Sequence, residues 1–113
     1  MIDSYGFGRI VVDQQRYTSD VIVFADRVKD SWWRREGHRL HVEDIERVVH
    51  EEKPDVLVVG TGYSGLMKVL PETEKYLKSN GIELIAQDTR EACKTFNRLV
   101  KSRKVIAALH LTC

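Results

Sequence analysis

The chain has 113 residues, enough for one domain and too few for two. Lys and Arg number 18 and Asp and Glu 17, which leaves a formal net charge of +1. Neither a nucleic-acid binder nor a membrane-surface binder is expected, because both usually carry a large basic excess. Hydrophobic residues make up 42%, enough for a core without metals or disulfides, so we expect residues 1–113 to form a single domain.

Cysteine usage and the N-terminal sequence bear on the compartment. The two cysteines, Cys93 and Cys113, form no disulfide framework, which favours a reducing environment. The first residues lack a basic segment followed by an apolar one, and no apolar run approaches the ~20 residues of a membrane span. We therefore expect a cytoplasmic protein without membrane contact.

The first third of the chain predicts short strands. Arg9–Asp13 is expected to form a short strand, and Val21–Phe24 is an apolar run. Tyr17–Thr18 has an extended pattern between them, and Val28 begins another short strand. Short strands at close spacing favour antiparallel pairing. We expect an N-terminal antiparallel hairpin region.

The rest of the chain alternates between strands and helices. The expected strands are Val56–Val59, Ile82–Ala86 and Val105–Leu109. The expected helices are Glu43–Glu52, a second from Pro71 to Asn80, and a third from an N-cap at Thr89 to Ser102. This β-α-β-α-β order predicts an α/β fold with parallel strands and right-handed crossovers.

A glycine-rich loop follows the strand Val56–Val59. Its spacing fits G-x-G-x-x-G, and an acid lies just past the next strand, as in dinucleotide-binding folds. The fingerprint is incomplete, because Leu66–Leu70 separates the loop from the helix that should meet a pyrophosphate. A tight turn required by packing, a cradle for a small anion and a nucleotide site all stay open. The candidate ligand-binding residues are Gly60, Thr61, Gly62, Ser64, Gly65, Asp88, Thr89 and Arg90.

No catalytic set emerges from the sequence. Ser64, Asp88 and His110 follow the chain order of α/β-hydrolases, but the G-x-S-x-G elbow lacks its final glycine. We assign no catalytic residue.

Two pairs of side chains have the spacing of metal ligands. They are His38-x-x-His41 and His110-x-x-Cys113, and together they could form a tetrahedral zinc site. The first pair lies in an expected loop and the second runs off a strand, so we expect ordinary polar roles, no metal and no cofactor.

The segment Trp32-Trp33-Arg34-Arg35 is the candidate for a protein contact, because Trp and Arg dominate interface hot spots. The alternative is structural, with one tryptophan in the core and the other beneath an arginine stem.

Ordered segments along the whole chain resemble a small domain family of unknown function. This family includes the adipogenesis-associated domain protein of animals and, more distantly, the mitochondrial NADH dehydrogenase assembly factor 3. The closeness of the match favours an archaeal member. The matching segments are Ser4–Gly8, Trp32–His38, Val58–Gly65, Asp88–Ala92, Phe96–Val100 and His110–Cys113.

The resemblance implies a three-layer α/β fold around a mixed sheet with one antiparallel strand. It also implies relatives that act as assembly or adaptor proteins, and no established enzyme activity. We therefore expect a non-enzymatic binding, adaptor or assembly module that contacts a protein partner or itself. The alternative is a protein, enzymatic or not, that binds a small anion or nucleotide at Gly60–Gly65.

Overall fold

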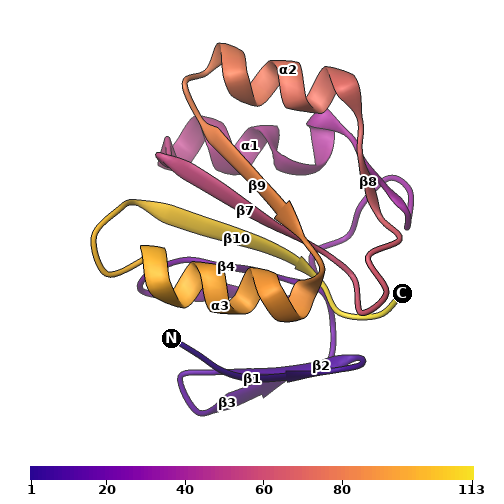
Figure 1. Cartoon of the computed structure of the whole chain (residues 1–113), viewed down its shortest axis with the longest axis vertical. Helices are drawn as coiled ribbons and strands as arrows, with labels where there is room; N and C mark the ends of the chain where they lie inside the picture. The colour runs from indigo at the N-terminus through magenta and orange to yellow at the C-terminus, as the bar shows by residue number, and fades with distance from the viewer.

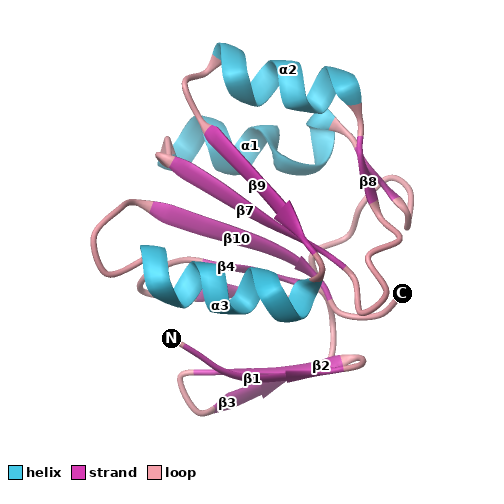
Figure 2. Cartoon of the chain, viewed as in Figure 1, coloured by secondary structure: helices cyan, strands magenta, loops and turns pink.

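A five-stranded mixed sheet forms the centre of the molecule (Figures 1 and 2). The computed structural model describes all residues from Met1 to Cys113. The strand order is β5-β4-β10-β7-β9, and β4 alone runs against the others. The strands are β4 (Val21–Val23), β5 (Val28–Lys29), β7 (Val56–Thr61), β9 (Glu83–Gln87) and β10 (Val105–His110).

Helices cover both faces of this sheet. In Figure 1, α1 (Val42–Glu52) and α2 (Pro71–Ser79) lie on one face and α3 (Thr89–Leu99) on the other. A small antiparallel sheet lies beyond α3 and consists of β1 (Ile2–Gly6), β2 (Arg9–Val12) and β3 (Gln15–Tyr17). The predicted three-layer α/β fold, its parallel β-α-β-α-β unit and its N-terminal antiparallel region are confirmed.

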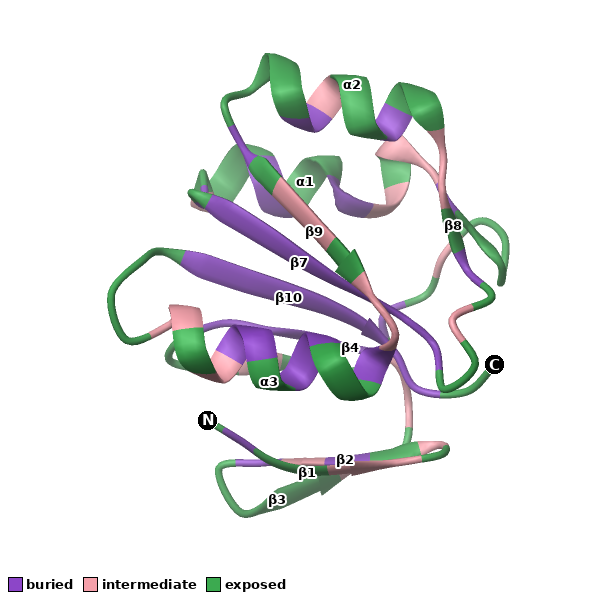
Figure 3. Cartoon of the chain, in the orientation of Figure 1, coloured by how far each residue is buried: buried purple, intermediate pink, exposed green.

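The middle of the sheet is buried on both faces. Every residue of β7 and β10 is buried (Figure 3), as the apolar runs Val56–Val59 and Val105–Leu109 predict. Two cores result, one between the sheet, α3 and the small sheet, the other beneath α1 and α2. The carboxyl ends of β7, β9 and β10 lie together at one end of the sheet, where ligands bind in many α/β folds.

Three short strands were not predicted. In β1 only Ile2 is buried, so the strand shows no apolar alternation, and its register against β2 shifts between Ile2 and Ser4. The remaining two, β6 (Arg39–Leu40) and β8 (Lys68–Val69), form a two-residue parallel ladder. Such short segments carry too few residues for a periodic pattern.

The predicted N-cap of α3 was wrong by one residue. Asp88 is the N-cap, and its side chain accepts a hydrogen bond from the Glu91 N–H at 3.1 Å. Thr89 is the first helical residue and is fully buried, because its hydroxyl bonds inward to the strand ends. The helix ends at Leu99 rather than Ser102.

Candidate functional site

The glycine-rich loop packs against the last residues of the chain. The Gly62 N–H donates to Thr89 Oγ1 at 2.9 Å, and the Tyr63 N–H donates to the Thr112 carbonyl at 2.7 Å. The Gly65 N–H donates to the Gly62 carbonyl at 3.2 Å, and the Leu66 N–H reaches the Cys113 carbonyl at 3.4 Å. An anion bound by any of these four amides would have to displace an acceptor of the protein itself.

Close packing explains two of the glycines. At Gly62 the backbone has φ +111°, and a Cβ atom would lie 2.5 Å from the Cys113 carbonyl oxygen. At Gly60 a Cβ atom would lie 2.8 Å from both Leu109 Cδ2 and Thr89 Oγ1. These contacts support the interpretation of the loop as a tight turn required by packing.

The other candidate ligand-binding residues lie around the same end of the sheet in different roles. Thr61 Oγ1 donates to the Gln87 carbonyl at 3.0 Å, and Ser64 is exposed. The Arg90 guanidinium carbon lies 5.5 Å from the centroid of the Tyr63 ring. Asp88 serves the helix as its cap. The structure brings these residues together, but most of their polar groups already have partners.

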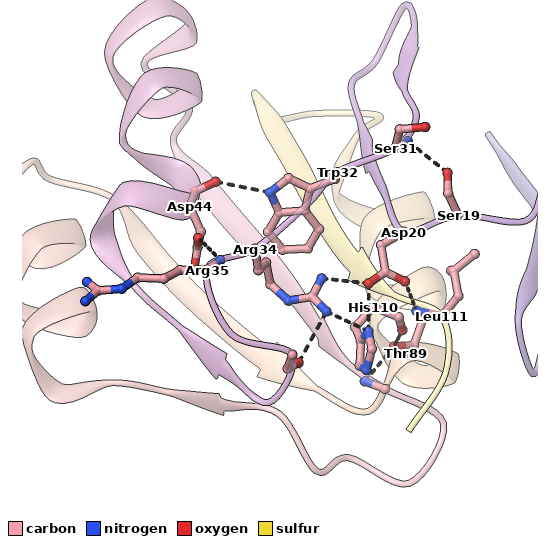
Figure 4. A network of polar contacts seen from close by, with 12 residues as sticks. Ser19, Asp20, Ser31, Trp32, Arg34, Arg35, Asp44, Thr89, His110 and Leu111 are labelled. Atoms are coloured by element: carbon pink, nitrogen blue, oxygen red, sulfur yellow. Dashed lines mark hydrogen bonds and ion pairs between the residues drawn. The ribbon is translucent and has the colours of Figure 1, made fainter.

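The Trp-Arg segment is anchored by its alternate residues (Figure 4). Trp32 is buried, with its indole Nε1–H donating to the Asp44 carbonyl at 3.1 Å and its backbone N–H to the Asp20 carbonyl at 2.9 Å. The Arg34 side chain is also buried, and its guanidinium carbon lies 4.8 Å from the centroid of the Trp32 ring. Trp32 and Arg34 therefore hold the segment in place and are not available to a partner.

A charged network lies beneath this segment. Arg34 Nη1 donates to Asp20 Oδ2 at 2.7 Å, and His110 Nδ1 lies 2.8 Å from the same oxygen. The Leu111 N–H donates to Asp20 Oδ1 at 2.7 Å. Arg34 Nη2 also lies 2.9 Å from His110 Nδ1. A nitrogen that carries a proton cannot accept, so we assign His110 Nδ1–H as a donor to Asp20 Oδ2. Arg34 Nη2 then donates to the Gly37 carbonyl at 3.3 Å.

This network sets the charge state of Asp20. Burial alone would raise the pKa of its carboxyl group, but hydrogen bonds from His110, the Leu111 N–H and Arg34 outweigh burial and hold the pKa below its ordinary value. Asp20 therefore stays ionised and links the Trp-Arg segment to the end of β10.

Trp33 and Arg35, the two alternate residues of this segment, face solvent. The Trp33 side chain is 80% exposed. The Arg35 side chain pairs with Glu43 at 2.9 Å, and its backbone N–H donates to Asp44 Oδ1 at 2.9 Å. Of the four residues predicted for a protein contact, these two are accessible.

A groove adjoins Trp33 and runs along α1. It consists of two hollows of about 290 and 500 Å³ that share Lys29, Arg47 and Val48 in their linings. Trp33 and Glu43 line the smaller hollow, and Glu51 and Glu52 line the larger one. The exposed indole of Trp33 therefore stands beside a groove with apolar and charged walls.

The histidines gather only in part. The rings of His38 and His110 have centroids 6.3 Å apart, whereas His41 Nε2 lies 2.5 Å from Glu36 Oε2 and Cys113 is exposed. No three His, Cys, Asp or Glu side chains converge on a common point.

None of the helices is both long and apolar enough to cross a bilayer.

The sequence did not identify the two acids that hold the Trp-Arg segment, or an exposed aromatic contact. Asp20 stands alone in the sequence, and Asp44 is one of several acids at the start of α1, so no motif marks either of them. Phe7 and Tyr63 are exposed and pack edge to face with ring centroids 5.7 Å apart. The shared position of Phe7 and Tyr63 depends on tertiary packing, which no local pattern reveals.

The profile of one family covers nearly the whole chain. Residues 2–110 match the family described as "Protein of unknown function (DUF498/DUF598)". The chain belongs to this family. The predicted resemblance is thereby confirmed.

Named relatives extend the comparison. NADH dehydrogenase [ubiquinone] 1 alpha subcomplex assembly factor 3 of Xenopus tropicalis is 41% identical over 54 residues, which are 48% of this chain and 29% of that protein. This chain therefore matches less than a third of the length of that relative. The relationship to an assembly factor, also predicted, is confirmed for that segment.

Solved structures share the fold over the full chain. The conserved hypothetical protein PH1505 of Pyrococcus horikoshii OT3 has a TM-score of 0.85 at 28% identity and is covered to 99%, with all of this chain aligned. A protein of Bartonella henselae described as an outer membrane protein has a TM-score of 0.83 at 28% identity, with 99% of this chain and 94% of that chain covered.

Proposed function

We propose that this protein is a non-enzymatic binding module whose partner protein contacts Trp33 and the adjoining groove. The observation that supports this most strongly is the 80% exposure of Trp33 on a segment that is fixed on both sides. A large indole left in water has no stabilising role in its own fold. Because its neighbours Trp32 and Arg34 are buried, the backbone of Trp33 is already held in place, and little backbone entropy is lost when a partner covers the indole.

The surroundings of Trp33 favour a protein as the occupant. Cations and acids both line the groove, where Arg47 pairs with Glu51 and Glu43 pairs with Arg35 of the neighbouring Trp-Arg segment. A phosphate-rich ligand would require a predominantly basic wall instead. The relationship to an assembly factor supports the same proposal.

We also propose a cytoplasmic location, on the basis of how the chain uses its two cysteines. Neither Cys93 nor Cys113 is in a disulfide, which supports a reducing environment such as the cytoplasm.

The experiment is a quantitative affinity capture with matched variants. Tagged wild-type protein, Trp33→Ala and Tyr63→Ala are each incubated with lysate of the source cells, and the bound proteins are quantified by mass spectrometry. Tyr63 is the control because it is exposed, at 49%, but does not line the groove. We expect one or a few proteins that wild type and Tyr63→Ala retain equally and Trp33→Ala loses by about tenfold or more. Equal recovery with all three baits would contradict the proposal.

A further inference from the structure

We propose that the exposed edge of β9 is a self-association surface on which a second copy of this chain pairs antiparallel with the first. This inference is independent of the Trp33 surface, because β9 and β5 are the opposite edges of the five-stranded sheet. Its starting point is a contrast between the two edges.

The β5 edge is protected in the way that monomeric proteins protect edge strands. It has two residues, one of which is Lys29. Short length and a lysine both discourage pairing with another chain. The β9 edge has five residues without proline, lysine or a bulge in its pairing with β7, and its only charge is Glu83 at the start. An edge of this kind is a template for strand addition.

The backbone of β9 presents hydrogen-bonding groups to solvent. The Glu83 N–H donates to the Asp55 carbonyl at 3.0 Å, so Glu83 points toward β7. Backbone polar groups alternate direction along a strand, so Ile85 and Gln87 also point inward, while Leu84 and Ala86 point outward. No other strand follows β9 in the sheet, so no ladder partner takes up these outward groups.

A two-fold axis between Ile85 of one copy and Ile85 of the other gives these outward groups hydrogen-bond partners. It places Leu84 opposite Ala86 of the second copy and Ala86 opposite Leu84. Each of these pairs exchanges two N–H···O=C bonds, as in an ordinary antiparallel ladder. The two sheets then continue as one.

The neighbouring helix favours a second copy over an unrelated strand. A groove of about 540 Å³ runs between α2 and the start of β9 and is lined by Glu74, Lys75, Lys78 and Leu84 among others. The same two-fold axis sets the two α2 helices side by side and antiparallel. Glu74 of each copy then faces Lys78 of the other, which places two ion pairs across the axis.

The test measures oligomeric state with light scattering and sedimentation over a wide concentration range. We expect a concentration-dependent dimer of wild-type protein. Ala86→Pro removes an outward N–H that the folded monomer does not use, and a proline is tolerated at such an edge position. It should give a folded monomer, as judged by circular dichroism and the melting temperature.

A charge-swap series keeps the test decisive if Ala86→Pro does not fold. Glu74→Lys alone places like charges together and should raise the dimer dissociation constant about tenfold or more. Glu74→Lys with Lys78→Glu should restore it to within about threefold of wild type. A wild-type monomer at every concentration, or a dimer indifferent to the charge reversal and its rescue, would overturn the inference.

Discussion

Trp32 and Trp33 are neighbours with opposite environments, 4% and 80% exposed. Trp32→Ala should lower the free energy of unfolding by about 3–5 kcal/mol, because it leaves a cavity in the core beneath α1. Trp33→Ala should change it by no more than about 0.5 kcal/mol, because its side chain is largely in water. Urea unfolding of both variants measures the difference. Similar losses for the two would show that Trp33 also supports the fold.

Asp20 is the residue on which the Trp-Arg segment depends most. Asp20→Asn should lower the free energy of unfolding at pH 7 by about 3 kcal/mol, because it leaves Arg34 buried without its counter-charge. Asp26→Asn is the matched control, since its ion pair with Arg27 is exposed and worth little.

The effect of Asp20 depends on pH with a defined sign. Its pKa is depressed in the folded protein, so its stabilisation is present above the unfolded value of about 3.9 and disappears as the pH falls through the lower folded pKa. The gap between wild type and Asp20→Asn should therefore shrink below about pH 4. Urea titrations from pH 7 downward measure this, and a gap that widens in acid would contradict the assigned charge state.

The two cysteines should differ in reactivity. Burial raises the pKa of the Cys93 thiol to about 12, with a further contribution from the Asp88 carboxylate, so almost no thiolate exists at neutral pH. Cys113 is exposed. A chromogenic disulfide reagent should react quickly with one thiol per native chain and with a second only after unfolding, and Cys113→Ser should abolish the fast phase. Two fast thiols in the native protein would show that the α3 core opens.

At the scale of elements, the glycine loop and the chain end form one unit. Gly62→Ala should lower the free energy of unfolding by about 1–3 kcal/mol or more, because the backbone has positive φ and the new methyl group meets the Cys113 carbonyl. Gly37→Ala is the control, since a Cβ atom there has open space and φ is not positive. Thermal or urea unfolding compares the two. If Gly62→Ala left the free energy of unfolding unchanged, the loop would not be a packed turn, and a flexible ligand site would again be the better interpretation.

The sequence predicts the elements that have enough residues to show a pattern. The buried runs of β7 and β10 and the apolar faces of α1 and α3 are long enough to reveal their period. The ladder of β6 and β8 is not, because pairing with distant residues creates it. The sequence also could not predict which tryptophan is buried. Trp32 and Trp33 are identical neighbours, and only tertiary structure places Trp32 against Asp44 and leaves Trp33 exposed.

At the scale of the whole molecule, the two proposed surfaces lie at opposite edges of the sheet. A dimer through β9 would leave both Trp33 grooves free, so the assembled protein would be bivalent. A partner with two matching sites would then bind more tightly than each site alone allows. This arrangement suits an assembly role, in which one protein holds two others or two copies of one.

The measurement that tests the central proposal most directly is site-specific photo-crosslinking beside Trp33. A photoreactive residue replaces Lys29, which lines the groove and leaves the indole intact. We predict a discrete adduct with a single protein in the source cells, and its loss when Trp33→Ala is added to the same chain. A discrete adduct that persists without the Trp33 indole, or no adduct at all, would contradict the account of this surface as the partner-binding site.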